Sequence, residues 1–255
     1  MLLALDVGNT NIVLGCFDGD KILFRERVST DRLATDLEYA TRIRMALDMY
    51  GIDRREITDA IISSVVPTVT NTLRQAVEKY TGCTPMTVGP GIRTGLSIVI
   101  DNPAQLGSDL VVDAVAGIHE YPLPLIIIDM GTATTFSIID EKARYRGGVI
   151  MTGMAVSTEA LVSRTSQLPR IAYEAPKHVI GTNTIDCMKS GIMYATASAL
   201  DGMIERIEEE LGAACTVVAT GGLAGAVIPL CRRKILLDDD LLLKGLRIIF
   251  EKNKG

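Results

Sequence analysis

One local pattern occurs twice in this chain and constrains its fold more than any other feature. An apolar strand runs into an aspartate, a turn of glycine and small polar residues, and a second apolar strand in LLALDVGNTNIVLGCFDGD and again, from Leu125, in LIIIDMGTATTFSIIDEKA. When Asp6 is aligned with Asp129, the turn glycines Gly8 and Gly131 also coincide. The chain therefore contains two strand-turn-strand units with the same chemistry at the same place.

The alignment extends through the turn, because Asn9 falls on Thr132 and Thr10 on Ala133. The repeat thus preserves the turn as well as the hydrophobic pattern, which indicates duplication. Two unrelated β-hairpins are the alternative, since hairpins are common.

The periodicity of apolar residues predicts a mixed α/β order in both halves. Short aliphatic runs bounded by Gly, Asp or Asn predict strands at 2–6, 11–17, 22–28, 59–65, 85–88, 125–129, 134–140 and 215–219. Helical spacing predicts helices at 36–50, 68–81, 108–119, 155–164 and 185–211. Adjacent strands followed by strands alternating with helices predict a mixed sheet with helices on its faces in each half.

The length favours two lobes. A chain of 255 residues exceeds the usual size of one domain. We expect an N-terminal lobe over residues 1–117 and a C-terminal lobe over residues 118–255. With 47% hydrophobic residues, four phenylalanines and no tryptophan, each lobe should have an aliphatic core.

Charge, cysteine content and hydropathy exclude several classes of function. A net charge of −5 with dispersed basic residues leaves no footprint for nucleic acid. No leader pattern and no apolar run of about 18 residues is present, so we expect no membrane association and a cytoplasmic location. The five cysteines are widely spaced, so we predict buried thiols in a reducing compartment and neither zinc sites nor disulfides. They are Cys16, Cys83, Cys187, Cys215 and Cys231.

The two aspartate-glycine turns are suited to binding phosphate. Glycine next to small residues exposes backbone N–H groups to phosphate oxygens. The carboxylate cannot bind phosphate itself, but it can position hydrated Mg²⁺ or another cation that does. Two such turns facing each other across a cleft would hold a nucleotide triphosphate from both lobes.

A strand, a glycine pair at Gly221 and Gly222, and a helix follow one another in VVATGGLAGAV. This order permits close approach of an adenosine to the backbone, although a plain turn is the alternative. The chain lacks the P-loop ending in Gly-Lys-Ser/Thr and lacks GxGxxG, which disfavours the common nucleotide-binding folds.

A third carboxylate lies in DNPAQLGSDLVVDAVAG, where Asp109 begins a predicted helix after Gly107. Either Ser108 or Asp109 could simply cap that helix. Capping is compatible with catalysis, because a carboxylate near the phosphates could accept the proton of an acceptor hydroxyl. The two histidines, His119 and His178, have no metal-pair spacing and are interpreted as surface or structural residues.

The helix predicted at 185–211 carries a wide apolar stripe that contains small residues. Its members are Met188, Ile192, Ala195, Ala199, Met203, Ile207 and Leu211. A helix packed in the core is the first interpretation, and a subunit interface is the alternative.

Motifs spread from Leu3 to Asn253 resemble one known family in their order. They are DVGNTN, SSVVP, VGPGIRTGL, DNPAQLGSD, DMGTATTF, GGVI, STEAL, LPR, IGTNT, SGIMY, ATGGLA and LLLKGLRIIFEKN. Together they are similar to the type III pantothenate kinases. DVGNTN alone would indicate only the broader superfamily of acetate and sugar kinases and actin.

The resemblance implies a duplicated ribonuclease-H-like, actin-like ATPase fold and a homodimer. It implies ATP-dependent phosphorylation of the pantothenate hydroxyl to 4′-phosphopantothenate, the first step of coenzyme A biosynthesis. The implied cofactors are ATP, Mg²⁺ and a monovalent cation, K⁺ or NH₄⁺.

The resemblance also assigns roles by position. The ATP-binding residues would be Asp6, Val7, Gly8, Asn9, Thr10, Asn11, Ile12 and Val13, joined by Thr132 and by the glycine pair Gly221 and Gly222. Asp129 would bind the monovalent cation, Asp6 would bind Mg²⁺ through water, and Asp109 would be the proton acceptor. The pantothenate pocket would contain Ile100, Gly107, Ser108, Asp109, Leu110 and Thr184.

This chain departs from the family pattern mainly on the acceptor side. The family usually has Tyr at Ile100 and Arg at Leu110. Loss of an arginine that pairs with a carboxylate typically weakens binding by about 1.5 to 3 kcal/mol, roughly ten- to a hundredfold. Arg93 is a possible substitute donor. Other departures are Ser108 for Ala, Asp113 for Asn, Met151-Thr152-Gly153 for Ala-Pro-Gly, and Ser137 where Asp is often found.

These departures leave two alternatives to a pantothenate kinase. One is a catalytically weak or inactive nucleotide-binding homologue with a regulatory role. The other is a kinase for another hydroxylated metabolite.

Overall fold

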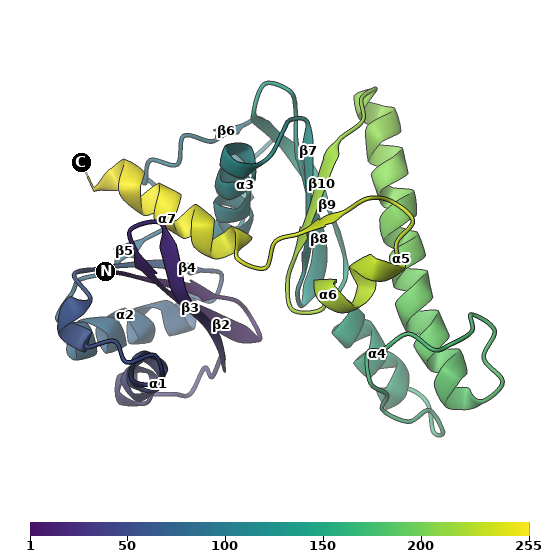
Figure 1. Cartoon of the computed structure of the whole chain (residues 1–255), viewed down its shortest axis with the longest axis horizontal. Helices are drawn as coiled ribbons and strands as arrows, with labels where there is room; N and C mark the ends of the chain where they lie inside the picture. The colour runs from purple at the N-terminus through teal and green to yellow at the C-terminus, as the bar shows by residue number, and fades with distance from the viewer. Residues whose placement is uncertain (255) are drawn as a thin grey trace. The chain divides into compact units, whose positions relative to one another are not determined.

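A computed structural model of the chain describes residues 1–254 (Figure 1). The strands are β1 (Leu2–Val7), β2 (Asn11–Asp18), β3 (Lys21–Ser29), β4 (Asp59–Ser64), β5 (Met86–Thr87), β6 (Ser97–Ile98), β7 (Leu125–Met130), β8 (Ala133–Ile139), β9 (Arg144–Thr152), β10 (Thr216–Thr220) and β11 (Leu236–Leu237). The α-helices are α1 (Asp36–Met49), α2 (Pro67–Thr81), α3 (Ser108–Glu120), α4 (Met154–Ser163), α5 (Thr184–Leu211), α6 (Ala224–Val227) and α7 (Leu241–Asn253).

The chain divides into two compact units that are not continuous in sequence. The first contains residues 1–96, 101–116 and those from 240 onward, and the second contains residues 97–100 and 117–239. The chain passes from the first unit to the second within α3, between residues 116 and 117. This point lies beside the lobe boundary expected at 117/118. Helix α7 differs from that expectation, because it belongs to the first unit, where its buried residues Leu243, Leu246 and Ile249 pack in one cluster with Leu2 of β1.

The first unit is built on a mixed sheet of order β3-β2-β1-β4-β5. β1 is antiparallel to β2 and parallel to β4. Side chains alternate between the faces of a strand, so Leu3, Leu5 and Val7 pack with α1 and α2, whereas Leu2 and Ala4 pack with α3 and α7. Figure 1 shows α1 and α2 on one face of this sheet and α7 on the other.

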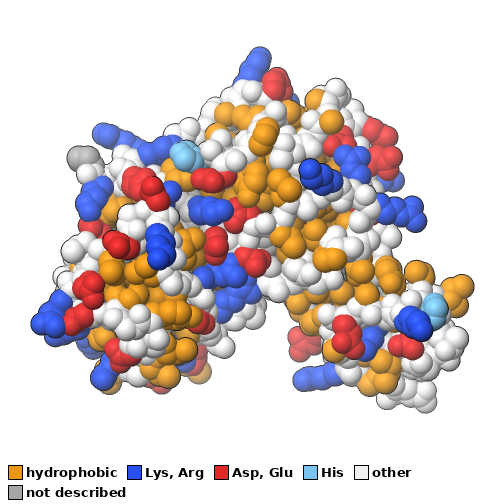
Figure 2. Space-filling view, in the orientation of Figure 1, with side chains coloured by type: hydrophobic (Ala, Val, Ile, Leu, Met, Phe, Trp, Pro, Cys, Tyr) orange, Lys and Arg blue, Asp and Glu red, His pale blue; other side chains and the backbone are white. Residues whose placement is uncertain are grey.

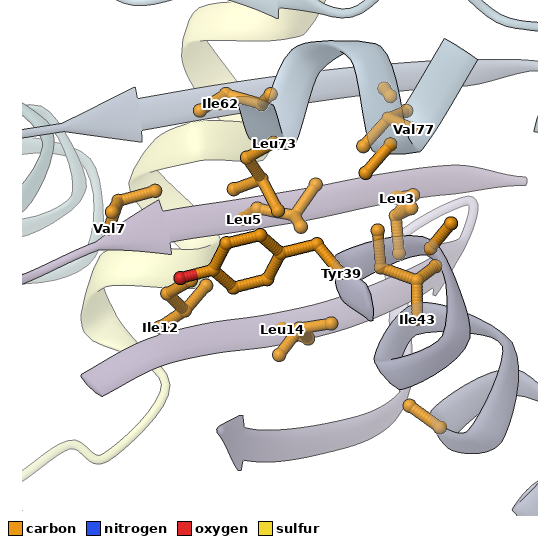
Figure 3. Packing of buried hydrophobic residues seen from close by; sticks show 14 of the residues in the cluster. Leu3, Leu5, Val7, Ile12, Leu14, Tyr39, Ile43, Ile62, Leu73 and Val77 are labelled. Atoms are coloured by element: carbon orange, nitrogen blue, oxygen red, sulfur yellow. The ribbon is translucent and has the colours of Figure 1, made fainter. Parts of the chain in front are cut away.

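The core under α1 and α2 is mainly aliphatic and contains the buried aromatic residues Phe24 and Tyr39. Tyr39 of α1 is 1% exposed, and Figure 3 shows its ring among Leu5, Ile12 and Leu14. Its hydroxyl points out of the cluster and bonds to the backbone of Asp31, just after β3. Thr35 caps α1 in a capping box with Glu38, which fixes where the helix begins.

The second unit is built on a mixed sheet of order β11-β10-β7-β8-β9-β6. β8 is antiparallel to β7 and β9, while β10 is parallel to β7 and β11. Ile126 and Ile128 of β7 pack with α5, so Asp129 lies on the opposite face of this sheet. The predicted architecture of two mixed sheets flanked by helices is thus confirmed.

The apolar patterns of the sequence do not predict β9 or α7. In β9, the pair Gly147 and Gly148 interrupts the apolar alternation. The glycine is required by packing, because a Cβ at Gly148 would lie 2.3 Å from the carbonyl oxygen of Phe136 on β8. Only the neighbouring strand explains why glycine stands there.

Candidate functional site

The first aspartate-glycine turn joins β1 to β2 and is fixed by hydrogen bonds. The Gly8 N–H donates to the carbonyl of Asn11 at 3.0 Å. Thr30, just after β3, donates its hydroxyl to the Gly8 carbonyl at 2.7 Å and its N–H to the Thr10 carbonyl at 2.9 Å. Sequence reasoning missed Thr30, because nothing in the pattern of β3 places its end against this turn.

Asp6 lies one residue before the end of β1 and is 6% exposed. It follows Leu2 and Ala4 on the face covered by α3 and α7. In the parallel pairing of β1 with β4, Asp6 stands opposite Ser63. The carboxylate therefore lies on the face that α3 covers, and the buried hydroxyl of Ser63 lies on the neighbouring strand.

Hydroxyl groups connect this end of β4 to the start of α3. Ser63, which is fully buried, donates to the hydroxyl of Ser108 at 3.0 Å, and Ser108 donates to the carbonyl of Ser64 at 3.0 Å. The hydroxyl of Ser108 thus bonds to β4, which differs from the helix cap that was one alternative for Ser108 or Asp109. Ser63 and Ser64 belong to the SSVVP motif, but only the position of β4 in the sheet shows that Ser108 is their partner.

Asp109 lies in the first turn of α3, and its Oδ1 accepts the N–H of Leu110 at 2.9 Å. A Cβ at Gly107 would lie 2.4 Å from this Oδ1, which explains glycine at that position. Burial raises the pKa of the Asp109 carboxyl, and the backbone N–H groups of Leu110 and Asp109 oppose this in part. A carboxylate with a raised pKa accepts a proton more readily than an ordinary aspartate.

We predict that Ser108→Ala lowers the free energy of unfolding by about 1 kcal/mol, because it removes a hydrogen bond and leaves buried Ser63 without its acceptor. Ser163→Ala is the matched control, since Ser163 makes one exposed bond to the carbonyl of Ala160. Urea denaturation of both variants checks the prediction. Equal stability of the two variants would contradict it.

The second turn joins β7 to β8 and is one residue shorter than the first. The last facing pairs are Val7 with Ile12 in the first hairpin and Met130 with Thr134 in the second. The alignment of Thr10 with Ala133 is therefore wrong, because Ala133 already belongs to β8. The Gly131 N–H donates to the Ala133 carbonyl at 3.0 Å, so the glycine keeps its role in the shorter turn.

Two distant glycines pack against this second turn. A Cβ at Gly153 would lie 2.3 Å from the Thr132 carbonyl oxygen and 2.4 Å from that of Gly131. A Cβ at Gly221, which has φ +99°, would lie 2.6 Å from Oδ1 of Asp129. The structure thus brings Asp129, Thr132 and Gly221 together, because β10 pairs with β7 up to Asp129.

The second turn places the Asp129 carboxylate and the carbonyl oxygen of Ala133 on the same side, since both lie within 4 Å of a Cβ built at Gly131. The Asp129 carboxylate sits in a space that a side chain at Gly221 would fill, beside the backbone of the turn. Oxygen ligands of this kind suit K⁺-like and Mg²⁺-like ions. Within residues 1–254, no group of three or more His, Cys, Asp or Glu side chains is placed to hold a metal, so an all-protein cage is not formed there.

Thr184 is the first residue of α5, after Asn183, whose side chain caps the helix by accepting the Asp186 N–H at 3.0 Å. It lines a cavity of about 920 Å³ in the second unit together with Thr152, Ser157 and several methionines and leucines. Ile180 and Ile185, close to the start of α5, are exposed. Figure 2 shows hydrophobic side chains interspersed with charged ones on this part of the second unit.

The stripe predicted on α5 mixes two faces of the helix. Ile192, Ala195 and Ala199 line the cavity. The face packed in the core is formed by Met193, Ala197, Leu200, Ile204 and Ile207, and Ile192, Met203 and Leu211 of the predicted stripe pack against it. The predicted packing of this helix in the core is thus confirmed for part of the stripe, because spacing alone does not separate the two faces of a long helix that is apolar on more than one side.

The remaining predicted substrate residues are divided between the units. Gly107 to Leu110 belong to the first unit, whereas Ile100 belongs to the second. The residue before Ile100, Val99, donates its N–H to the Tyr145 carbonyl in β9. The backbone of Arg93 is held at both its N–H and its carbonyl by the Asn253 side chain, at 2.9 and 2.8 Å.

The remaining polar candidates fit the sequence interpretation only in part. His119 and His178 are exposed, as expected for surface residues. All five cysteines are free, but only Cys16 is buried, and its burial raises the pKa of the thiol to about 11. Cys187 is exposed, contrary to the expectation of buried thiols. No helix within residues 1–254 is long and apolar enough to span a bilayer.

Comparisons with known proteins agree over the full length of the chain. The family model described as type III pantothenate kinase matches residues 2–206. Proteins named type III pantothenate kinase from Exiguobacterium sp. and Halalkalibacterium halodurans are each 46% identical to this chain, over 254 and 253 residues. The alignments cover 100% and 99% of this chain, and 100% of each relative.

Solved structures show the same fold at low sequence identity. A conserved putative Baf family transcriptional activator from Campylobacter jejuni superposes with a TM-score of 0.59 at 18% identity, covering 99% of this chain and 98% of that one. The activator of the 2-hydroxyisocaproyl-CoA dehydratase from Clostridium difficile, with bound ADPNP, gives 0.58 at 15% identity, covering 99% and 97%. The duplicated ribonuclease-H-like fold class expected from the sequence is confirmed.

Proposed function

This chain belongs to the type III pantothenate kinase family, and we propose which of its residues perform each part of the family's reaction. The enzyme transfers a phosphoryl group from ATP to the hydroxyl of pantothenate in coenzyme A biosynthesis. The observation that carries this function is 46% identity over the whole length of named relatives. Individual side chains and backbone turns perform the separate parts of this transfer.

Asp109 is the proton acceptor. The pantothenate hydroxyl oxygen forms a bond to the γ-phosphorus, and the bond from that phosphorus to the β-bridging oxygen breaks with its electron pair going to ADP. The hydroxyl proton passes to the Asp109 carboxylate. Supporting this role are the position of Asp109 at the start of α3, the glycine that leaves its Oδ1 room, and the raised pKa of its carboxyl.

The first turn, residues 8–10 with the flanking strand ends, binds ATP phosphates through backbone N–H groups other than that of Gly8, which donates to the Asn11 carbonyl. Its support is the rigid bonding from Thr30, which holds the turn in one conformation before ATP arrives. In the second unit, Thr132 adds a phosphate contact, and the backbone at Gly221 and Gly222 approaches the adenosine.

Cations complete the proposal. Asp6 would hold Mg²⁺ through water and Asp129 the monovalent cation, K⁺ or NH₄⁺. The fit rests on the oxygen donors of both residues and on the space beside Asp129. When bound, these ions neutralise charge on the phosphates during transfer.

Pantothenate binding is assigned to Ile100, Gly107, Ser108, Leu110 and Thr184. Because Leu110 replaces an arginine, the carboxylate of pantothenate lacks one charge-assisted partner there, and we expect a raised KM. This same observation favours a second candidate, a kinase whose preferred acceptor is another hydroxylated metabolite. We further propose a homodimer and a cytoplasmic location, because membership of the family implies both.

The test is direct. Purified protein with ATP, Mg²⁺ and K⁺ should convert pantothenate to a product heavier by one phosphate, with equal release of ADP, and Na⁺ in place of K⁺ should lower the rate. Mass spectrometry and a coupled ADP assay measure both. ADP release with another acceptor but not with pantothenate would favour the second candidate, and no release with any acceptor would leave the nucleotide-binding homologue.

We predict an acid limb in the pH dependence of kcat that reports Asp109. The base must be ionised, so kcat falls as the pH decreases through the pKa of this carboxyl. Burial raises that pKa, so the midpoint of the acid limb should lie above the ordinary value of 3.8 for an aspartate. The pH–rate profile at saturating ATP and pantothenate checks this. A midpoint at or below the ordinary value would contradict the assignment.

A further inference from the structure

The segment that follows β3 lies directly on the first phosphate turn and brings a cation there. Thr30 bonds to the carbonyls of Gly8 and Thr10. Two residues later, Nη2 of Arg32 donates to Oδ1 of Asn9, in the middle of the turn, at 3.3 Å. The turn itself, in DVGNTN, contains no basic residue.

The backbone on both sides of Arg32 is held in place by the core. The hydroxyl of Tyr39 donates to the Asp31 carbonyl at 2.7 Å and accepts the Asp31 N–H at 2.9 Å. The Leu33 N–H donates to the Asp31 carboxylate at 2.9 Å. Because Tyr39 is buried under the first sheet (Figure 3), Arg32 starts from a defined position beside the turn while its side chain is exposed.

The guanidinium of Arg32 differs from those of its neighbours in its partner. Arg25, Arg42 and Arg44 form ion pairs with Asp240, Asp31 and Asp48. Within residues 1–254, Arg32 forms no ion pair and donates only to the neutral amide of Asn9. A long bond to a neutral acceptor is weaker than a charge-assisted bond, so an anion at the turn would replace it readily.

We propose that Arg32 binds the β- and γ-phosphate oxygens of ATP at the first turn, exchanging its bond to Asn9 for bonds to phosphate. The proposal rests on the assignment of this turn to ATP. A guanidinium donates two parallel N–H bonds to a phosphate. It stabilises the negative charge that develops on the leaving ADP oxygen as the bond to the γ-phosphorus breaks. Arg32 would thus add a side-chain cation to a site otherwise built from backbone N–H groups.

The test compares Arg32→Met with Arg44→Met in steady-state kinetics. Arg44 is exposed on α1 and pairs only with Asp48 one turn away, so its loss should change little. Arg32→Met should lower kcat/KM for ATP about ten- to a hundredfold, as expected for a lost charge-assisted bond. The KM for pantothenate should stay within about twofold, and Arg32→Lys should recover part of the loss because it keeps the charge.

Nucleotide binding separates a phosphate contact from a structural role. In calorimetric titrations, Arg32→Met should bind ATP and ADP more weakly but adenosine as the native enzyme does, with a melting temperature equal to that of Arg44→Met. Equal weakening for adenosine, or a lower melting temperature, would show that Arg32 only supports the turn and would overturn the proposal.

A double-mutant cycle with Asn9 provides the second decision. If Arg32→Met has no further effect on ATP kinetics in an Asn9→Ala background, Arg32 acts only through Asn9 and the proposal is wrong. A full additional loss supports a direct phosphate contact. Failure of the proposed function itself looks different, because the native enzyme would then release no ADP with pantothenate.

Discussion

Replacing Asp109 by asparagine should lower kcat by about a hundred- to ten-thousandfold, the usual contribution of a general base. Asparagine keeps the size and the acceptor oxygen that bonds to the Leu110 N–H, but it cannot take the hydroxyl proton. ATP affinity should stay nearly unchanged, since the turn at Gly8, to which we assign the ATP phosphates, is a separate element. Single-turnover kinetics and ATP titration measure the two effects. A variant that phosphorylates pantothenate at the native rate would remove Asp109 from its role.

The same substitution should not destabilise the enzyme at neutral pH. The pKa of Asp109 is raised in the folded state, so the folded protein binds this proton more tightly than the unfolded chain. Its contribution to stability is therefore full below the unfolded pKa and is lost as the pH rises through the folded pKa. Above that pH the buried charge opposes folding, and Asp109→Asn relieves it.

Urea denaturation at neutral and acidic pH checks this stability effect. Asp109→Asn should be as stable as the native enzyme or more so at neutral pH, and any gain should shrink as the pH falls. Asp18→Asn is the control, because Asp18 is exposed at the end of β2 far from the turn. A loss of stability at neutral pH in Asp109→Asn alone would contradict the linkage.

Substitution of Gly221 by alanine should produce a large loss of stability at the second turn. The residue has φ +99°, and the new Cβ would lie 2.6 Å from Asp129 Oδ1 and 2.6 Å from the Met130 nitrogen. Left-handed backbone costs about 1 to 2 kcal/mol for a residue with a side chain, and overpacking about 1 to 3 kcal/mol. We therefore expect the free energy of unfolding to fall by about 2 to 5 kcal/mol.

Gly225→Ala is the matched control for this effect. Gly225 lies in α6, and nothing comes within 4 Å of a Cβ placed there, so alanine should be neutral or slightly stabilising.

Gly221→Ala should also lose K⁺ dependence and raise the KM for ATP, because its methyl group displaces the Asp129 carboxylate. Unfolding midpoints and K⁺ titrations of both variants measure these effects. Indistinguishable midpoints would mean that Asp129 moves aside freely.

Much of the fold could be predicted because its signals are local. The strands β1, β2 and β7 begin and end within one or two residues of their predicted positions, since apolar runs bounded by Gly, Asp or Asn act over a few residues. The same local chemistry identified Asp6, Asp129 and the turn glycines. Strand β9 was not predicted because Gly147 and Gly148 interrupt its apolar alternation, and the need for glycine at 148 is seen only in its contact with β8.

The parts of the site that escaped prediction depend on which strands become neighbours. Ser63 bonds to Ser108 across 45 residues of sequence. Arg32 reaches Asn9 across 23 residues. Neither pair has a spacing signature, because the contact is created by sheet order and register and not by the residues between them. The position of α7 on the first sheet could not be predicted from the sequence for the same reason.

The amino-acid sequence was enough to establish the family, the mixed α/β class, and the carboxylates and glycines at the ends of β1 and β7, because strand alternation and turn chemistry are short-range properties. Three-dimensional contacts were needed to show that α7 completes the first core, that Gly221 leaves room for Asp129, and that Thr30 and Arg32 bond to the first turn. Such contacts arise when strand pairing brings residues that are distant in sequence to the same end of a sheet. The sequence of an amphipathic segment shows which of its faces is apolar, but it does not indicate which element will cover that face.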